Sequence, residues 1–282
     1  RQRQMCIRDR DLGEYTGKHF IAITDPGSSL EEMGKKYKFR KIFLNNPNIG
    51  GRYSVLSYFG IVPAALVGID IEKLLKNASA TTKECKKATS KSADIGIIIS
   101  ELAKQGRDKL TFIYSKQIRS FGTWVEQLIA ESTGKDGKGI LPVESESLLS
   151  PIYYSDDRVF VYTHFENDNE WTEGIDKLKE AGHPVIDISL ENVYDLGTEF
   201  YRWEFATAVA GWNLEIQPFD QPNVESAKIE AKAMINSYLQ KGELPKLEAI
   251  IENDGIKFYG NTSKKKLEKA FNSFLDLSLI HI

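Results

Sequence analysis

The sequence of 282 residues is poor in cysteine, with only Cys6 and Cys85. Two cysteines give no disulfide framework and no metal-ligand pattern, so we expect a reduced, cytoplasmic setting. The sequence also lacks an apolar run of the roughly 20 residues that a membrane-spanning helix needs, and no signal peptide is visible. These absences argue against a disulfide-stapled or membrane-embedded fold.

The sequence has no strong excess of charge of either sign. Its 37 lysines and arginines and 40 aspartates and glutamates leave a formal net charge of −3, and the two signs are mixed along the chain. Binding to nucleic acid or to an anionic membrane needs a basic surface, so neither partner is expected. Hydrophobic residues make up 41% of the chain, which is enough for a sizeable core in one large or two ordinary domains.

The two ends of the chain look foreign to the rest. MCIRDR at residues 5–10 and LSLIHI at residues 277–282 are what the two strands of a sequencing-library transposon end encode when translated. We therefore expect residues 1–10 and 277–282 to make few core contacts, and the remainder, with 33 basic and 39 acidic side chains, to be an internal fragment. The alternative is that both are ordinary tails.

Short apolar runs alternate with helical patterns along the chain. Strands are expected at residues 19–25, 41–44, 110–114, 139–143, 159–163, 184–188 and 256–259, and the first of them is expected to be buried. Helices are expected at residues 28–37, 53–58, 63–76, 93–105, 122–132, 170–181 and 196–214, and again from residue 263. This alternation predicts α/β units with doubly wound parallel sheets, right-handed crossovers and ligands at the carboxyl ends of the strands.

Two helical segments, 63–76 and 196–214, are apolar on most faces and should therefore be buried. Glu204 lies within the second of them. A buried carboxylate needs a partner, so we expect Glu204 to pair with a neighbouring side chain. The alternative, that Glu204 acts in catalysis, stays open. Between the first segment and residue 93 the chain is polar and rich in lysine, as is typical of a solvated turn or helix start.

Residues 122–139 combine a helix with a glycine-rich loop. One apolar stripe at helical spacing consists of Trp124, Val125, Leu128 and Ile129. Gln127 and Glu131 are four residues apart and share a face. Glu131 also borders the stripe, where partial desolvation favours a general base. Gly134, Gly137 and Gly139 end the helix and are expected to leave an open, mobile turn. On pattern alone, the commoner interpretation of Glu131 is a solvated carboxylate.

Arg52 directly follows Gly50 and Gly51. A glycine pair permits backbone conformations that other residues do not adopt easily, and the planar fork of an arginine suits an anionic oxygen pair in a ligand. An arginine in this position is more often a surface or structural ion-pair residue, and that alternative stays open.

A further helix follows Asp220, its N-cap candidate, with Pro222 near its first position. The stripe expected to be buried consists of Val224, Ala227, Ala231, Ile235 and Tyr238. Lys228 flanks this stripe in the second turn and, on pattern alone, is interpreted as an ordinary exposed lysine.

Three motifs in chain order carry a resemblance to a known family. They are NIGGRYS at residues 48–54, ESTGK at residues 131–135 and FDQPNVESAK at residues 219–228. In this order and spacing they resemble phosphoglucose isomerase, and the likeness covers residues 11–276. The amino-acid sequence around the second motif is most similar to the isomerase half of fused transaldolase/phosphoglucose isomerase proteins.

The resemblance implies two sugar-isomerase (SIS) domains. Residues 11–108 would be the C-terminal part of a truncated first domain with additional helices, and residues 109–276 the second domain with its C-terminal helices. It also implies interconversion of glucose 6-phosphate and fructose 6-phosphate through an enediolate, a step of glycolysis and gluconeogenesis that needs no cofactor or metal.

The resemblance also assigns roles to single residues. Glu131 would be the proton-transfer base and Arg52 would stabilise the enediolate, while Lys228 would assist ring opening and contact the substrate. Further contacts with the sugar or its phosphate would come from Gln127, Gln221 and Gly51.

Two features of the family are absent from the sequence. The glycine-rich segment that ends in a ring-opening histidine is not recognisable, and we expect His164 and His183 to be structural. The serine- and threonine-rich phosphate loop would lie before residue 11. Two rival hypotheses remain, a non-catalytic sugar-phosphate-binding module of the same fold and an unrelated doubly wound binding protein, and the oligomeric state stays open.

Overall fold

The computed structural model describes residues 13–87, 89–244, 248–253, 255–260, 263 and 266–281. Two compact units, Arg1–Phe219 and Asp220–Ile282, make up the chain, and we describe them separately. This division by compactness does not test the domain boundaries expected from the sequence. Of the expected foreign tails, residues 1–10 and residue 282 lie outside the described residues, and residues 277–281 are described only as helical backbone.

The first unit opens with a small β–α–β motif. A 3₁₀ helix (η1, Gly13–His19) leads into the parallel strands β1 (Ile21–Thr24) and β2 (Lys41–Leu44), which are joined by helix α2 (Ser29–Lys36). Ser28 is the N-cap of α2, because its side chain accepts a hydrogen bond from the Glu31 backbone N–H. Both strands and the serine cap were predicted from the sequence and are confirmed.

A four-stranded parallel sheet forms the centre of the first unit. Its strands, in the order β4-β3-β5-β6, are Leu141–Val143, Lys109–Tyr114, Arg158–Phe165 and Val185–Leu190. The helices around it are α4 (Ile71–Glu84), α5 (Lys91–Lys104), α6 (Arg119–Thr133), α7 (Thr172–Glu180) and α8 (Leu196–Asn213). The predicted α/β class with parallel strands is therefore confirmed.

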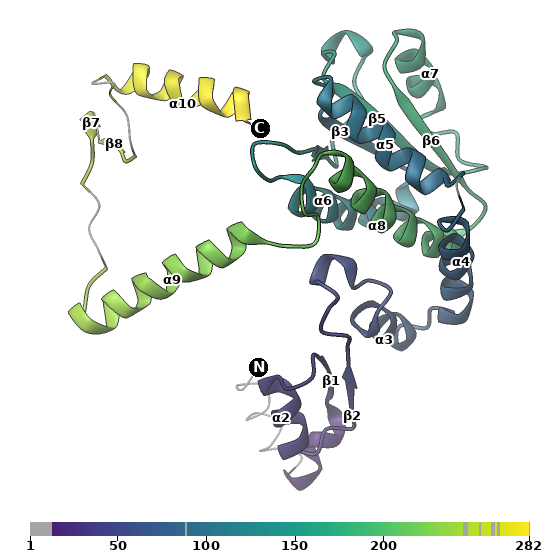
Figure 1. Ribbon diagram of the computed structural model, residues 1–282, viewed down its shortest axis with the longest axis vertical. Helices are drawn as coiled ribbons and strands as arrows, with labels where there is room; N and C mark the ends of the chain where they lie inside the picture. The colour runs from purple at the N-terminus through teal and green to yellow at the C-terminus, as the bar shows by residue number, and fades with distance from the viewer. Residues whose placement is uncertain are drawn as a thin grey trace. The chain divides into compact units, whose positions relative to one another are not determined.

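Alternate residues of the central strands face two separate cores. Leu110, Phe112 and Tyr114 of β3 pack in the larger core together with residues of α5, α6 and α8. Ile113 of β3 packs in the smaller core with residues of α7. Helix α7 therefore lies on one face of the sheet, with α5, α6 and α8 on the other, as Figure 1 shows. The sheet is buried on both faces, which explains the continuous apolar runs of its strands.

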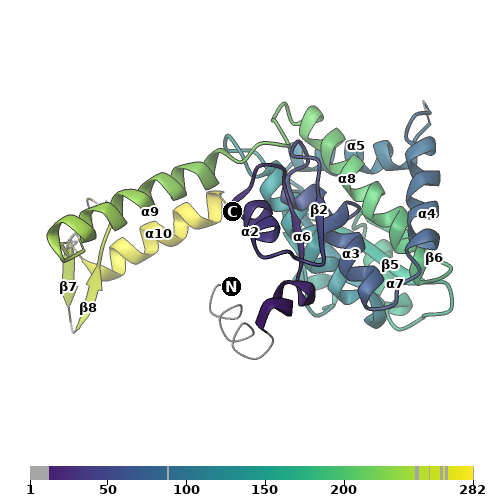
Figure 2. The same ribbon diagram turned by 90° about the horizontal axis from the view of Figure 1, so that it is seen from below.

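Helix α8 is a core helix, as its apolar composition predicts. It packs against α4, α5 and α6, and Figure 2 shows α4 and α5 beside it. The side chain of Trp203 at its centre is fully buried and meets the ring of Phe112 edge to face. Small residues permit the close approach, since a Cβ on Gly197 would lie 2.1 Å from the Leu74 carbonyl oxygen of α4.

The expected buried helix at residues 63–76 is wrong. The chain instead forms α3 (Tyr58–Leu66) and α4, interrupted at Gly68, whose φ of +89° suits glycine. No residue of α3 is buried, because apolar composition alone does not provide a covering element. The helix expected at residues 53–58 is also absent: a 3₁₀ turn (η2, Gly51–Tyr53) ends where it was expected to begin, and residues 54–57 are not helical.

The second unit contains helix α9 (Pro222–Lys241), the antiparallel strands β7 (Ile251–Asn253) and β8 (Ile256–Phe258), and helix α10 (Leu267–His281). The predicted N-cap is wrong by one position, since Gln221 rather than Asp220 precedes Pro222 at the first turn. The predicted buried stripe is also wrong in its described part, because Ala227, Ala231, Ile235 and Tyr238 are all exposed. Helical periodicity defines an apolar face but not a structure that covers it.

Candidate active site

The carboxyl-terminal end of α6 holds the central candidate residue. Val125, Leu128 and Ile129 are fully buried, so the predicted stripe anchors the helix in the larger core. Glu131 lies in the last turn of the helix and is only partly buried, because it borders this stripe. Gln127 Nε2 donates a hydrogen bond to Glu131 Oε1 at 3.0 Å, which confirms that the two side chains share a face.

Arg52, which is 80 positions before Ser132 in the chain, lies at the same helix end. Its side chain is buried, with Nε donating to Ser132 Oγ at 2.7 Å and Nη2 donating to the Pro218 carbonyl oxygen at 2.6 Å. Nη1 lies 3.8 Å from Glu131 Oε2. The guanidinium is thus fixed in orientation, with one edge toward the carboxylate.

Tyr53 reinforces the position of Arg52. Its hydroxyl donates to Ser132 Oγ at 3.0 Å and approaches the Pro218 carbonyl oxygen at 3.3 Å, so it meets the same two groups as the guanidinium. Its ring packs against Phe219. Burial raises the pKa of Tyr53, so the phenol stays a neutral donor.

The glycine-rich turn after α6 is closed rather than open. Lys135 and Lys138 form an antiparallel β-bridge across it, and the side chain of Lys135 is buried. Lys135 Nζ donates to the Gln217 carbonyl oxygen, and Lys138 Nζ donates to the Leu214 carbonyl oxygen at 2.8 Å. The expectation of an open turn is wrong because glycine content predicts permissive backbone, not the side-chain bonds that fasten it.

The glycine pair before Arg52 does not adopt a conformation that requires glycine. Gly50 has φ −65° and ψ 156°, and Gly51 is not among the residues with positive φ. A Cβ on either glycine would have no heavy atom within 4 Å. The backbone argument for this pair is therefore wrong, and what the pair provides is open space beside Arg52.

The family membership of the chain follows from comparison of its sequence. Residues 3–146, just over half of the chain, match the family model of phosphoglucose isomerase. The chain belongs to the phosphoglucose isomerase family. Two of the three motifs, around Arg52 and Glu131, lie inside this matched region.

Curated relatives agree with this family. The chain is 28% identical over 299 residues to the glucose-6-phosphate isomerase of Leptospira biflexa, covering 89% of this chain and 65% of the relative. It is 31% identical over 250 residues to a probable glucose-6-phosphate isomerase of Methanococcus maripaludis, covering 75% and 56%. The chain thus spans no more than about two thirds of the length of these relatives. Its expected origin in a transaldolase fusion stays a prediction.

Solved structures share the fold. A hypothetical protein from Thermus thermophilus aligns with a TM-score of 0.73 at 21% identity, covering 80% of this chain and 65% of that one. A glucose-6-phosphate isomerase from Chlamydia trachomatis aligns with a TM-score of 0.64 at 16% identity, covering 84% and 56%. At such identities the likeness concerns the fold alone.

The remaining residues implied by the phosphoglucose isomerase resemblance belong to the second unit. Lys228 lies in the second turn of α9 and is exposed, and Gln221 precedes the helix. Their convergence with Arg52 and Glu131 stays a prediction. Arg52 and Glu131, together with Gln127, are brought together within the first unit.

Glu204 does not pair as expected. Its Oε1 atom is buried and has no hydrogen-bond partner in the described part of the chain. Burial raises its pKa to about 8, because a carboxylate without a compensating group is costly away from water. Its negative form also acts on Tyr53, whose pKa it raises, so Glu204 belongs to the surroundings of the Arg52 cluster.

The two histidines have the structural contacts that were expected. His164 stacks on the ring of Tyr162 with centroids 4.2 Å apart, and its Nε2 lies 3.1 Å from Asp187 Oδ1. His183 packs edge to face against Tyr154 and Phe160. Neither contacts the Arg52–Glu131 pair, so the residue that would open the sugar ring is not identified.

Sequence reasoning missed three residues of the site, Ser132, Tyr53 and Lys135. All three lie inside the motifs, directly beside Glu131, Arg52 or Gly134, so adjacency was an available signal. Within the described residues, no group of three or more histidine, cysteine, aspartate or glutamate side chains could hold a metal ion. Among the helices of that same part of the chain, none is long and apolar enough to cross a membrane.

Proposed function

We propose that this protein takes part in the interconversion of glucose 6-phosphate and fructose 6-phosphate, with Glu131 as the proton-transfer base. The observation that carries the proposal is the 3.8 Å separation of Arg52 Nη1 and Glu131 Oε2 within two family motifs. An aldose–ketose isomerisation needs this combination, a carboxylate that takes and returns one proton and a cation where negative charge develops.

Glu131 is suited to move the proton between adjacent carbons of the open-chain sugar. Its carboxylate removes the proton from C2 of the aldose, and the electron pair of the broken C–H bond forms the enediolate. The carboxylate then returns the proton to C1 while the O2 hydroxyl proton passes to O1, so C2 becomes a carbonyl group and C1 a CH2OH group. Gln127 donates to Oε1, so it orients the carboxylate and leaves Oε2 toward Arg52. In the reverse direction the same carboxylate acts between the same two carbons.

Arg52 supplies the positive charge for the enediolate. Its Nε and Nη2 are bound to Ser132 and Pro218, so the guanidinium does not have to reorient as charge builds on the sugar oxygens. The open space beside Gly51 supports close approach of a substrate to the backbone next to this cation. Gly51 therefore stays a candidate substrate-binding residue.

Lys228 and Gln221, which lie in the second unit, are proposed as substrate-contacting residues on the family resemblance alone. Lys228 would assist ring opening, and Gln221 would contact the sugar or its phosphate. The partner is thus a small sugar phosphate, whereas nucleic acid and membrane partners are not proposed. A cytoplasmic location stays a prediction from the cysteine content, and the oligomeric state is left open.

The test of the proposed base is Glu131→Gln. The amide keeps the size and the hydrogen bond to Gln127 but cannot accept a proton, so kcat should fall by about 10²–10⁴-fold, while binding of fructose 6-phosphate changes much less. The assay follows glucose 6-phosphate formation in the chain as it stands and, where its reading frame extends upstream, in the extended protein. We expect most activity in a protein that contains the family's phosphate loop, because that loop would bind the phosphate of the substrate.

Glu126→Gln is the matched control, since Glu126 is an exposed carboxylate on the same helix. It should leave turnover within about twofold of the starting protein. Equal turnover of the Glu131→Gln and Glu126→Gln variants would remove Glu131 from the mechanism. Binding of the sugar phosphate with no turnover in the unmutated extended protein would instead favour a non-catalytic sugar-phosphate-binding module.

A further inference from the structure

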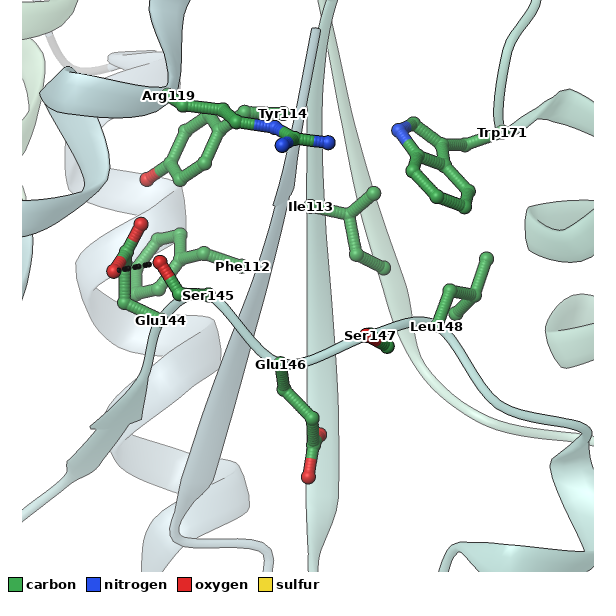
Figure 3. Close-up of a pocket in the computed structure, with 10 residues that line it drawn as sticks. All are labelled: Phe112, Ile113, Tyr114, Arg119, Glu144, Ser145, Glu146, Ser147, Leu148 and Trp171. Atoms are coloured by element: carbon green, nitrogen blue, oxygen red, sulfur yellow. Dashed lines mark hydrogen bonds between the residues drawn. The ribbon is translucent and has the colours of Figure 1, made fainter. Parts of the chain in front are cut away.

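A pocket opens near the amino-terminal end of α6, and we call it the amino-end pocket. It has a volume of about 150 Å³ and lies where strands β3 and β4 end. Figure 3 shows Arg119, from the start of α6, extending over Tyr114 toward Trp171, with the loop of residues 144–148 passing below. Ile113 and Leu148 lie between these groups and make an apolar floor.

The pocket occupies the position where doubly wound sheets bind ligands. The chain passes from β3 through α6 to β4 on one side, and then returns to β5 on the other side of β3. Helix α6 covers one face of the sheet and α7 covers the other, so the connections diverge between β3 and β5. Such a divergence leaves a crevice at the carboxyl ends of the strands, which is the general ligand position in this class of fold.

A buried hydroxyl in this pocket has no partner among the described residues. Tyr114 is only 5% exposed and lines the pocket, yet its hydroxyl forms no hydrogen bond with any residue that the structure describes. Figure 3 shows the hydroxyl on the same side as the carboxylate of Glu144. A buried hydroxyl without a hydrogen bond is costly, so this one is suited to a group that a ligand supplies.

Two opposite charges in the pocket are also uncompensated. Arg119 is exposed and forms no ion pair or hydrogen bond within the described part of the chain. Among the residues that the structure describes, Glu144 receives a hydrogen bond only from Ser145, at 2.5 Å. Glu146, the third charged residue of the lining, is already neutralised by Arg158, whose Nη1 lies 2.8 Å from its Oε2.

These charges select the class of ligand. A phosphate or other anion would satisfy Arg119 but meet repulsion from Glu144, and a simple amine would meet the reverse problem. A zwitterion satisfies both. The volume corresponds to about five water molecules at roughly 30 Å³ each, so the ligand must be small, and the apolar floor favours a short hydrocarbon side chain.

We propose that this pocket binds a small α-amino acid. Its carboxylate would pair with Arg119, its ammonium group with Glu144, and its side chain would lie on Ile113, Leu148 and Trp171. The Tyr114 hydroxyl would complete the contacts. The site does not depend on the proposed isomerase function, because none of its residues belongs to the Arg52–Glu131 cluster.

The test is isothermal titration of the 282-residue chain with alanine and valine, with acetate, methylamine and inorganic phosphate as single-charge probes. We expect millimolar binding of the amino acids and at least about tenfold weaker binding of each single-charge probe. Arg119→Gln should weaken alanine binding by at least about tenfold. Lys116→Gln, which removes an exposed cation three residues away that does not line the pocket, should leave it within about twofold.

A second variant separates binding from folding. Tyr114→Phe keeps the ring and removes only the unpartnered hydroxyl, so the protein should stay folded by circular dichroism while alanine binds several-fold more weakly. Absence of heat with every probe, binding of phosphate or acetate as tight as that of alanine, or unchanged alanine affinity in Arg119→Gln would each overturn the proposal.

Discussion

At the carboxyl end of α6 the charged side chains are bonded by the protein itself, whereas at its amino end they are not. Arg52 is buried, donates to Ser132 and Pro218, and faces Glu131. Arg119, at the other end, has no ion pair within the described residues, and neither has Glu144. A cation that is already oriented suits a charge that exists only in a transition state. Arg119 and Glu144, which have no ion pair among the described residues, are suited to a ligand that carries the opposite charges.

The largest effect in this comparison is expected from Arg52→Lys. Lysine keeps the charge but cannot donate to Ser132 and Pro218 while still facing Glu131, so the orientation is lost. In an active protein kcat should fall by about 10²–10³-fold, with a smaller change in KM. Steady-state assay of fructose 6-phosphate conversion measures both constants.

Arg40→Lys is the control, because Arg40 is an exposed arginine of the first unit. It should leave both constants within about twofold. If Arg52→Lys raised KM and left kcat unchanged, the guanidinium would bind the ground state and would not serve the enediolate.

Glu204 is the exception to the comparison. Its Oε1 atom has no hydrogen-bond partner among the described residues, although the side chain lies near the Arg52 cluster. Its pKa of about 8 in the folded state exceeds the ordinary value of 4.5. Between these two values the unfolded chain ionises and the folded chain does not, so the free energy of unfolding falls as pH rises from about 4.5 to 8. Each pKa unit corresponds to about 1.4 kcal/mol, so the loss is on the order of a few kcal/mol.

Glu204→Gln removes this loss. Urea unfolding should give a variant that is more stable than the starting protein at about pH 8, by an amount that shrinks toward about pH 5. Glu126→Gln, at an exposed position, should keep the pH dependence of the starting protein. A Glu204→Gln variant with an unchanged pH dependence would show that Glu204 gains a partner or solvent in solution.

The smallest effect is expected from Gly122→Ala, at the amino end of α6. A Cβ there would lie 2.6 Å from a ring carbon of Tyr114 and 2.7 Å from Cγ of Glu144, so the wall of the amino-end pocket must shift. We expect a loss of about 1–2 kcal/mol in unfolding free energy, offset in part by the helix propensity of alanine. Alanine binding should weaken while the Arg52 cluster is unaffected. Thr123→Ala, at the exposed next position, should change neither property, and equal calorimetric titrations of both variants would contradict the assigned wall.

The elements of the sheet were predictable because their sequences carry local signals. The strands around Phe112 and Val161 are apolar runs, and Ser28 and Gly106 stand where a helix begins and ends. The break at Gly68 was missed because the apolar run continues across it. Apolar composition predicts that a segment is buried. In the described part of the chain, however, no residue of α3 is buried and the apolar residues Ile235 and Tyr238 of α9 are exposed.

The site was predictable in part. The family resemblance located Glu131 and Arg52, and their spacing in the chain could not have done so, because 78 residues separate positions that meet within 3.8 Å. The bond from Arg52 to Pro218 joins positions 166 residues apart and involves a carbonyl group, which every residue has. Glu204 was not predictable for a related reason, since no sequence pattern indicates that a buried carboxylate oxygen lacks a hydrogen-bond partner in the fold.

The two lysines of the turn after α6 couple parts of the chain that are remote in sequence. Lys135 and Lys138 bond the carbonyl groups of Gln217 and Leu214, where the chain leaves α8. A local fluctuation that frees the turn must therefore also release the exit of α8, so both segments should open as a single cooperative unit with one free energy of hydrogen exchange. The position of the Glu131 carboxylate, one turn before Lys135, therefore depends on residues 214–217, which are remote from it in sequence.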